Sequence, residues 1–245
     1  MLFRQMKYFI AVVERGSFTE AAEQCYISQS AVSQQIRALE KELRIGYLRC
    51  YSGQELHQAV AEFSQVYPEV SISIVNGTHE ELYDLLRFGG ADLVLTDQRR
   101  AFSDKYTNYQ LLKCGCYAEV SVRSRLARQE FVTMEDLKHQ ACILISSREQ
   151  QNTEEDYFKN TLGFGGRFLF AENLEEGRLM VAGNRGFLPI ESVGTLPPPV
   201  AAVKRLPIME IGKQLQRNYC LFWVKEHTNY YIEEFAEILR KLLRR

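Results

Sequence analysis

The sequence has no long apolar run, and none of its hydrophobic stretches approaches the roughly 20 residues that a membrane-spanning helix needs. Its first residues, MLFRQMKYFIAVVERG, also lack the apolar centre of a signal peptide, because charges interrupt them at Arg4, Lys7, Glu14 and Arg15. We therefore expect a cytoplasmic protein that does not use a membrane.

An excess of charge of one sign is also missing. The 30 basic side chains oppose 31 acidic ones, which leaves a formal net charge of −1. A nucleic-acid binder that is basic along its whole length is therefore excluded, whereas a local basic surface is not. The length of 245 residues allows more than one domain.

Motifs of metal, redox and catalytic chemistry are absent. Cys114 and Cys116 form CGC rather than CxxC, and the four histidines are dispersed. We interpret the two cysteines as small side chains on a strand, with a redox sensor as the alternative. No G-x-S-x-G, H-E-x-x-H, Walker or G-x-G-x-x-G motif occurs. We expect no enzyme, no catalytic residue, no metal site and no cofactor.

Three short helices are predicted within residues 1–43. An apolar residue recurs every three or four positions in residues 3–14, which is typical of an amphipathic helix, and Gly16 would end it. Ser17 and Ser28 each offer a side-chain oxygen that can cap the start of a further helix.

The third of these helices carries short hydroxyl and amide side chains outside its packed face. A helix that reads the major groove needs such groups near its N-terminus, because Gln can pair with adenine and Ser can donate or accept. An arginine there can hold a phosphate or a guanine. The candidate residues are Gln29, Ser30, Ser33, Gln34 and Arg37. From the pattern alone, a three-helix bundle with a polar outer face remains an alternative.

The stretch FIAVVERGSFTEAAEQCYISQSAVSQQIRALEKEL resembles the N-terminal helix-turn-helix of the LysR-type transcriptional regulators. The resemblance implies a bacterial regulator in which Gln29, Ser30, Ser33 and Gln34 read bases of double-stranded DNA. It implies that Arg37 clamps the DNA backbone, and that the protein is a homodimer or a homotetramer.

From Arg44 onward the pattern changes to that of an α/β fold. RIGYLRC, VSISIV and ADLVLT are predicted strands separated by amphipathic helices, which indicates a parallel sheet with helices on its faces. A second block of the same kind contains ACILIS and GRFLFA. Two lobes joined by crossing strands would enclose a hinged cleft.

This part resembles the LysR-type effector-binding domain, whose fold is like that of type II periplasmic binding proteins. The expected fold class is α/β, with a helix-turn-helix DNA-binding domain at 1–43 and a two-lobed effector-binding domain at 44–245. Lobe I would comprise about 44–115 and 217–245, and lobe II about 116–216.

Hydroxyl side chains follow the predicted strands or begin the predicted helices where the cleft would lie. With helix N-terminal amides they would suit a small-molecule effector that is a carboxylate or another anion. These candidate effector-binding residues are Tyr51, Ser52, Thr78, Thr96, Ser146 and Ser147. An ordinary cap or turn is the alternative at each position. Arg148 could add a positive charge, although a solvent-exposed arginine is the simpler interpretation.

The chain departs from the family where its two parts join. LysR-type regulators carry a wing and a long linker helix there, and that helix pairs two subunits. Here Leu43 is followed at once by RIGYL, so the segment is either truly absent or omitted from this sequence. Residues 1–43 carry five basic and five acidic side chains, so we expect this part to bind DNA weakly on its own.

Two hypotheses of different classes follow. The first is a sequence-specific regulator that binds a partly palindromic DNA site, with a small molecule in the cleft altering the geometry of the subunits. The second is a small-molecule-binding module that uses its helical part only for assembly. The second hypothesis predicts no salt-dependent binding to DNA.

Overall fold

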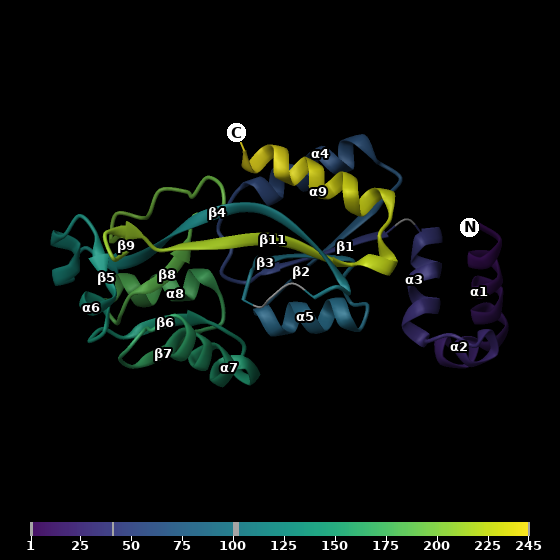
Figure 1. Cartoon of the computed structure of the whole chain (residues 1–245), viewed down its shortest axis with the longest axis horizontal. Coiled ribbons are helices and arrows are strands. Elements are labelled where there is room, and N and C mark those ends of the chain that lie inside the picture. Colours follow the sequence, from purple (N-terminus) through teal and green to yellow (C-terminus); the bar gives the residue numbers. More distant parts are fainter. Residues whose placement is uncertain (1, 41, 100–102, 245) are drawn as a thin grey trace.

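The computed structural model describes residues 2–40, 42–99 and 103–244, with the backbone alone described for residues 2, 3 and 37–40. Three bodies lie in a row along the long axis: a helical headpiece (residues 2–40), lobe I and lobe II (Figure 1). None of the helices formed by the described residues combines the length and the apolar character that crossing a membrane requires.

The headpiece contains the three predicted helices, α1 (Leu2–Arg15), α2 (Phe18–Cys25) and α3 (Gln29–Glu40). The hydroxyl oxygens of Ser17 and Ser28 accept hydrogen bonds from the backbone at the starts of α2 and α3, as predicted. Small side chains allow the helices to pack closely around one core. Its buried members are Ala11, Ala21, Ala22, Val32 and Ile36.

Lobe I is built on three parallel strands in the order β3-β1-β2, which confirms the predicted parallel sheet. These strands are β1 (Glu42–Leu48), β2 (Ser71–Gly77) and β3 (Leu93–Asp97), and the lobe's helices are α4 (Glu55–Val66), α5 (His79–Arg87) and α9 (Tyr230–Leu243).

The helices of lobe I cover both faces of its sheet. Helices α4 and α9 lie on one face and α5 on the other (Figure 1). The rings of Phe63 on α4 and Phe235 on α9 pack with their centroids 5.7 Å apart. Gly46 allows the close approach of α5, because a Cβ atom there would lie 2.8 Å from Val94 Cγ1 and 2.9 Å from Leu82 Cδ2.

Two long antiparallel strands, β4 (Tyr106–Ser121) and β11 (Gln216–Val224), connect the lobes. The first part of β4 pairs with β11, and its last part pairs with β8 (Leu188–Glu191) and β9 (Val203–Glu210) in lobe II. With β10 (Lys213–Gln214) at its edge, one sheet in the order β10-β9-β4-β11-β3-β1-β2 therefore runs through both lobes. The predicted crossing strands are confirmed.

Lobe II adds a two-stranded parallel sheet, β6-β7, and short helices around its own core. Its further strands are β5 (Val132–Thr133), β6 (Cys142–Ile145), β7 (Phe168–Ala171) and β10 (Lys213–Gln214). Its helices are α6 (Met134–Leu137), α7 (Gln151–Asp156) and α8 (Leu174–Ala182), and a π-helical turn (Tyr157–Thr161) continues α7. The 3-10 turns are η1 (Arg125–Arg128) and η2 (Arg148–Gln150), with η4 (Lys225–His227) in lobe I.

The junction between headpiece and lobe I is direct. Helix α3 ends at Glu40 and β1 begins at Glu42, so the described residues contain neither a wing nor a linker helix between them. The strand begins two residues before the predicted Arg44, because Glu42 already pairs with Ser71 in the parallel sheet. The Glu42 carboxylate also accepts a hydrogen bond from the Ser73 hydroxyl at 2.5 Å.

Candidate functional site

Helix α3 carries the residues predicted to read DNA bases, and the structure gives them different exposures. Gln29 is exposed, Ser30 and Gln34 are half-buried, and Ser33 is only 7% exposed. The side chain of Arg37 lies outside the described residues. In this arrangement, only part of the predicted reading surface is open to a DNA groove.

The partly covered residues of α3 face lobe I, and α3 is the headpiece helix nearest to that lobe (Figure 1). The Gln34 side-chain amide donates to Nδ1 of His227 at 3.1 Å, because an amide nitrogen can only donate. A Cβ atom added to Gly89 of lobe I would lie 3.5 Å from the same Gln34 nitrogen. Burial lowers the pKa of His227, with the charges of Glu226 and Asp92 opposing that shift.

A buried ion pair joins lobe I to lobe II. Arg99, which follows β3, donates to the two carboxylate oxygens of Glu154 on α7 at 2.7 and 3.0 Å. The same guanidinium donates through Nε to Asp97 at 3.1 Å and lies 4.0 Å from the ring centre of Tyr157. The side chains of Arg99 and Glu154 are 9% and 5% exposed, so water screens their attraction weakly.

Arg217 on β11 extends this network. Its guanidinium donates to the Asp97 carboxylate and to the Tyr157 hydroxyl, and its Nε lies 3.6 Å from Glu191 on β8. Arg217 is 8% exposed, and its Nη1 has no hydrogen-bond partner among the described residues. A buried guanidinium nitrogen without an acceptor costs free energy, so this atom marks a place where a ligand oxygen would be stabilised.

The charges of the network determine which of its carboxyl groups ionise. Burial opposes ionisation of Asp97, but the charge of Arg99, the hydrogen bond with His79 and the charge of Arg217 hold its pKa well below the usual range. Burial raises the pKa of Glu191 despite the opposing charge of Arg217. Asp97 therefore stays ionised, while Glu191 takes up a proton more readily than a solvated carboxyl group does.

A second polar bridge between the lobes is centred on Glu81 of α5. Its carboxylate accepts from the Thr78 backbone at 2.7 Å, from the Ser147 hydroxyl of lobe II at 2.6 Å, and from Arg49 at 3.4 Å. The structure thus brings together two predicted effector-binding residues, Thr78 and Ser147. They meet on a carboxylate of the protein itself, in the place where the sequence analysis predicts an anionic effector.

The other predicted effector-binding residues are divided among three places. Thr96 joins the Arg99 network, since its hydroxyl donates to Asp97 at 3.2 Å. Ser146 is 1% exposed and donates to the Ser147 carbonyl oxygen at 3.0 Å. The hydroxyls of Tyr51 and Ser52 are buried and have no hydrogen-bond partner among the described residues.

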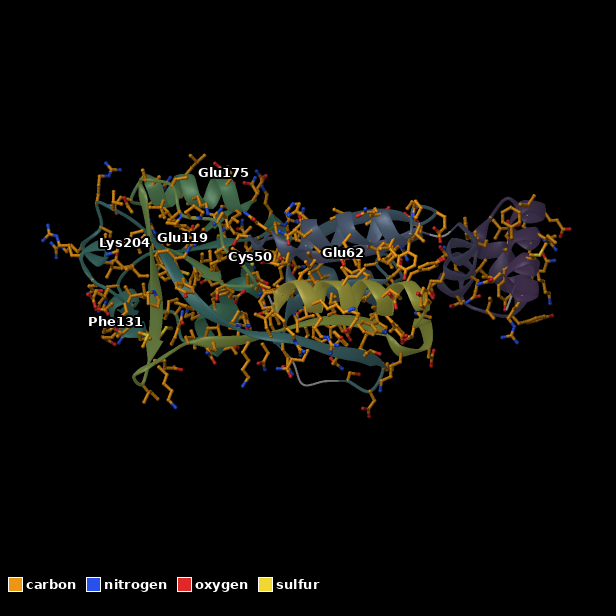
Figure 2. The ribbon with its side chains drawn as sticks, turned by 90° about the horizontal axis from the view of Figure 1, so that it is seen from above. Cys50, Glu62, Glu119, Phe131, Glu175 and Lys204 are labelled. Carbon is orange, nitrogen blue, oxygen red and sulfur yellow. The ribbon has the colours of Figure 1, made fainter. Side chains whose placement is uncertain are left out.

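The cavity between the lobes is lined by charged residues that were not predicted from the sequence. Arg99 and Arg217 share it with Cys50 and with apolar side chains of β6, β8 and the π turn. Figure 2 shows Cys50 at the junction, between Glu62 of lobe I and Glu119 of lobe II. The motif D-x-R directly after the strand ADLVLT was a usable signal for Asp97 and Arg99. Arg148, by contrast, has an 85% exposed side chain.

The cysteine pair of CGC lies in the interior. Cys114 is 2% and Cys116 is 5% exposed, and burial raises the pKa of both thiols. The thiolate is the form that reacts with oxidants, so burial disfavours the redox-sensor alternative. No group of three or more His, Cys, Asp or Glu side chains suited to a metal ion occurs within the part of the chain that the structure describes.

Both parts of the chain match known protein families. Residues 3–46 match the model of the bacterial regulatory helix-turn-helix protein, lysR family. Residues 37–244 match the model of the LysR substrate binding domain. The two matches overlap at residues 37–46, which include the end of α3 and the start of β1.

Individual relatives agree with these matches. ClcR, an HTH-type transcriptional regulator of Pseudomonas putida, is 44% identical over 64 residues, which is 26% of this chain and only 22% of ClcR. CysL of Bacillus subtilis is 23% identical over 216 residues, covering 68% of this chain and 71% of CysL. The solved structure of a full-length OxyR variant from Pseudomonas aeruginosa has the same fold, with a TM-score of 0.65, 16% identity and 96% of each chain covered.

Proposed function

Because this chain belongs to the LysR family of bacterial regulators, we propose that it is a sequence-specific transcription regulator controlled by a small molecule bound between lobes I and II. The observation that carries the proposal is the match of one chain to both the helix-turn-helix and the substrate binding domain of the family. Regulators of this family are in general not enzymes. Double-stranded DNA as a partner would place the protein in the cytoplasm.

Residues 1–43 are the proposed DNA-binding domain, and residues 44–245 the proposed effector-binding domain. Helix α3 enters the major groove with its N-terminal half. There Gln29, Ser30, Ser33 and Gln34 read base edges, and Arg37 holds the DNA backbone.

DNA reading requires the headpiece to leave its contact with lobe I. Gln34 can pair with a base only when its amide is released from His227, and Ser33 must become exposed. The headpiece has no excess of positive charge, so one copy neutralises few phosphates and binds weakly. A homodimer or homotetramer would place two or more headpieces on one site and compensate for this weakness.

The proposed effector is a small anion, such as a carboxylate. It would supply the acceptor that Arg217 Nη1 lacks and compete with Glu154 for Arg99. Hydroxyl side chains near the lobe junction would complete the proposed site. They belong to Tyr51, Ser52, Thr78, Thr96, Ser146 and Ser147. Displacing Glu154 would weaken a contact between the lobes, so binding would favour a different lobe arrangement.

One observation favours the alternative, a small-molecule-binding module whose helices serve assembly. Ser33 is buried, and the Gln34 amide is hydrogen-bonded to His227. In this arrangement neither side chain is open to a DNA base. The two functions differ in whether the intact protein selects a DNA sequence.

A selection from a pool of random duplexes with the intact protein tests the proposed function. We expect enrichment of a partly palindromic sequence, with binding that weakens steeply as salt increases. Recovery of unselected sequences at every salt concentration, with and without small carboxylates, would support the alternative.

A further inference from the structure

Lobe II has a polar hollow that is separate from the cavity between the lobes. It lies between the segment that follows β4 and the segment that follows α8, and its volume is about 360 Å³. Small-molecule sites in proteins have roughly 300–1,000 Å³. None of its lining residues also lines the cavity between the lobes. We call it the lobe II hollow, and its polar side chains are those of Arg123, Ser124, Arg125, Gln140, Asn184 and Arg185.

Three arginines give the lobe II hollow a positive charge. They are Arg123, Arg125 and Arg185, and none of the other described residues that line the hollow is an Asp or a Glu. Within the part of the chain that the structure describes, their guanidinium groups form no ion pair. Arg178 and Arg205 of the same lobe, by contrast, both bind the buried carboxylate of Glu119. A chain with a net charge of −1 thus has a local excess of three positive charges here.

The first wall of the hollow is fixed by hydrogen bonds. Arg123 donates to the carbonyl oxygen of Ala182, the last residue of α8, at 3.1 Å. This bond offsets the negative end of the helix dipole, and the guanidinium keeps further N–H groups for a ligand. The Ser124 hydroxyl oxygen accepts from the Leu126 backbone at 3.3 Å, which fixes the turn that begins η1.

The second wall is a tight turn after α8. Asn184 has a φ of 58°, in the left-handed region that Asn adopts more readily than most residues. The Arg185 backbone donates to the Met180 carbonyl oxygen at 3.1 Å. Gly186 allows the turn to approach the start of β6, because a Cβ atom there would lie 2.3 Å from the Ala141 backbone oxygen. Both walls are therefore held by the fold, which reduces the entropy lost when a ligand binds.

The side chains of the hollow favour phosphate over carboxylate. A guanidinium group can donate two parallel hydrogen bonds to a phosphate. A phosphate group on an organic molecule carries about −1.5 to −2 charges and three acceptor oxygens. A carboxylate has one charge and two oxygens, so it would leave part of the three-arginine cluster without an acceptor. The amides of Gln140 and Asn184 can bind polar groups in the rest of the ligand.

The position of the hollow argues against DNA as its ligand. Lobe II and the headpiece lie at opposite ends of the molecule, with lobe I between them (Figure 1). DNA bound by α3 of the same chain would therefore lie far from the hollow. Surfaces that bind nucleic acids are typically basic stripes or faces, whereas these arginines line one concave place.

We propose that the lobe II hollow is a second ligand site, which binds a small molecule bearing a phosphate or pyrophosphate group. The three arginines bind the phosphate oxygens, and the neighbouring hydroxyl and amide groups complete the site. It is distinct from the proposed effector site, because the two cavities share no lining residue. The proposal does not depend on DNA reading.

Isothermal titration calorimetry of the full chain with pyrophosphate, at constant ionic strength, tests the proposal. We expect saturable binding of one pyrophosphate per chain. Arg125→Gln and Arg185→Gln should each weaken it by at least about tenfold, because each removes a charge-assisted contact. Circular dichroism should show both variants folded like the wild type, since both side chains are exposed. Arg148→Gln is the matched control: it removes the same charge from an 85% exposed side chain of lobe II and should bind like the wild type.

Two further titrations identify the source of the phosphate. ADP that binds more tightly than pyrophosphate would indicate an organic phosphate ester, and the reverse order would indicate the free anion. Both ligands should lose affinity in Arg125→Gln. A random DNA duplex should not displace pyrophosphate.

Four outcomes would overturn the proposal. They are no binding of pyrophosphate or ADP by the wild type, unchanged affinity in Arg125→Gln and Arg185→Gln, an equal loss in Arg148→Gln, and displacement by duplex DNA. Failure of the chain to select a DNA sequence would not affect these results, so this proposal and the proposed function fail separately.

Discussion

Arg99 at the end of β3 and Glu154 on α7 form a bidentate ion pair, 2.7 and 3.0 Å long, that closes lobe I onto lobe II. Both side chains are more than nine-tenths buried, and Asp97 and Tyr157 contact the same guanidinium. The Glu154 carboxylate thus binds Arg99, the arginine that the proposed anionic effector would bind. We propose that this pair, one of the polar contacts between the lobes, couples the lobe arrangement to the proposed effector site.

Removing one partner of this pair should destabilise the protein. Glu154→Leu leaves a buried guanidinium with Asp97 as its remaining partner, and we expect a loss of about 3 kcal/mol in the free energy of unfolding. Urea denaturation followed by circular dichroism measures this loss. The control is Arg148→Met, which removes an exposed pair with Glu172 and should change stability by about 0.5 kcal/mol or less. Equal losses in the two variants would contradict the role assigned to Glu154.

Gln29 is the predicted base-reading residue that is already exposed, so its replacement tests DNA reading without disturbing lobe I. Gln29→Ala should weaken binding to the selected DNA sequence by about 1–3 kcal/mol and leave binding to random DNA unchanged. Fluorescence anisotropy with both duplexes measures the difference. Gln65→Ala, at an exposed position of α4, is the control and should bind like the wild type. A parallel loss on random DNA would show that Gln29 does not read a base.

The contact between Gln34 and His227 should weaken in acid. Burial lowers the pKa of His227, so the docked headpiece disfavours the protonated ring, and a protonated Nδ1 can no longer accept from Gln34. The contact should be fully present above the ordinary histidine pKa of about 6.5 and should be lost as the pH falls through the lowered value.

Small-angle X-ray scattering measures this change as an increase in the radius of gyration on acidification. His227→Gln is the control, because its side-chain oxygen can still accept from Gln34 but does not titrate in this range. The radius of gyration of this variant should be the same at neutral pH and in acid. An identical acid response in the variant would assign the change to another group.

Arg217 should be required for any stabilisation by small anions. We expect acetate, succinate or citrate to raise the melting temperature of the full chain where a carboxylate fits Arg217 Nη1. Arg217→Met should remove this shift, whereas Arg148→Met, at an 85% exposed side chain, should retain it. Since Arg217→Met can itself lower stability, the shift is compared within each variant, with chloride at equal ionic strength. A shift retained by Arg217→Met would place the anion elsewhere.

Local sequence patterns predicted most of the elements. The alternating and buried runs around Ile45, Ile74 and Val94 became parallel strands, and Ser17 and Ser28 begin the helices that they were predicted to cap. Such features depend on neighbouring residues alone, because helical and strand periods repeat within a few positions. The resemblance of residues 1–43 to a helix-turn-helix rests on the same local information.

The candidate site could be predicted only in part. Thr78 and Ser147 both contact Glu81 at the lobe junction, and this partner was not predicted; their binding of an effector stays a prediction. Asp97 and Arg217 meet although 120 positions separate them in sequence. Their meeting depends on β11 lying beside β3, and strand order does not follow from the composition of either strand.

The sequence by itself determined the class of the protein: three amphipathic helices, then two α/β lobes, in the order of a LysR regulator. The tertiary structure decided which surfaces are open and which charges are paired. It buried Ala11 and left Ile10 exposed on the same helix, and it paired Arg99 with the Glu154 carboxylate of the opposite lobe. Periodicity specifies that a helix has an apolar face, whereas burial and ion pairing depend on residues that only long-range packing brings together.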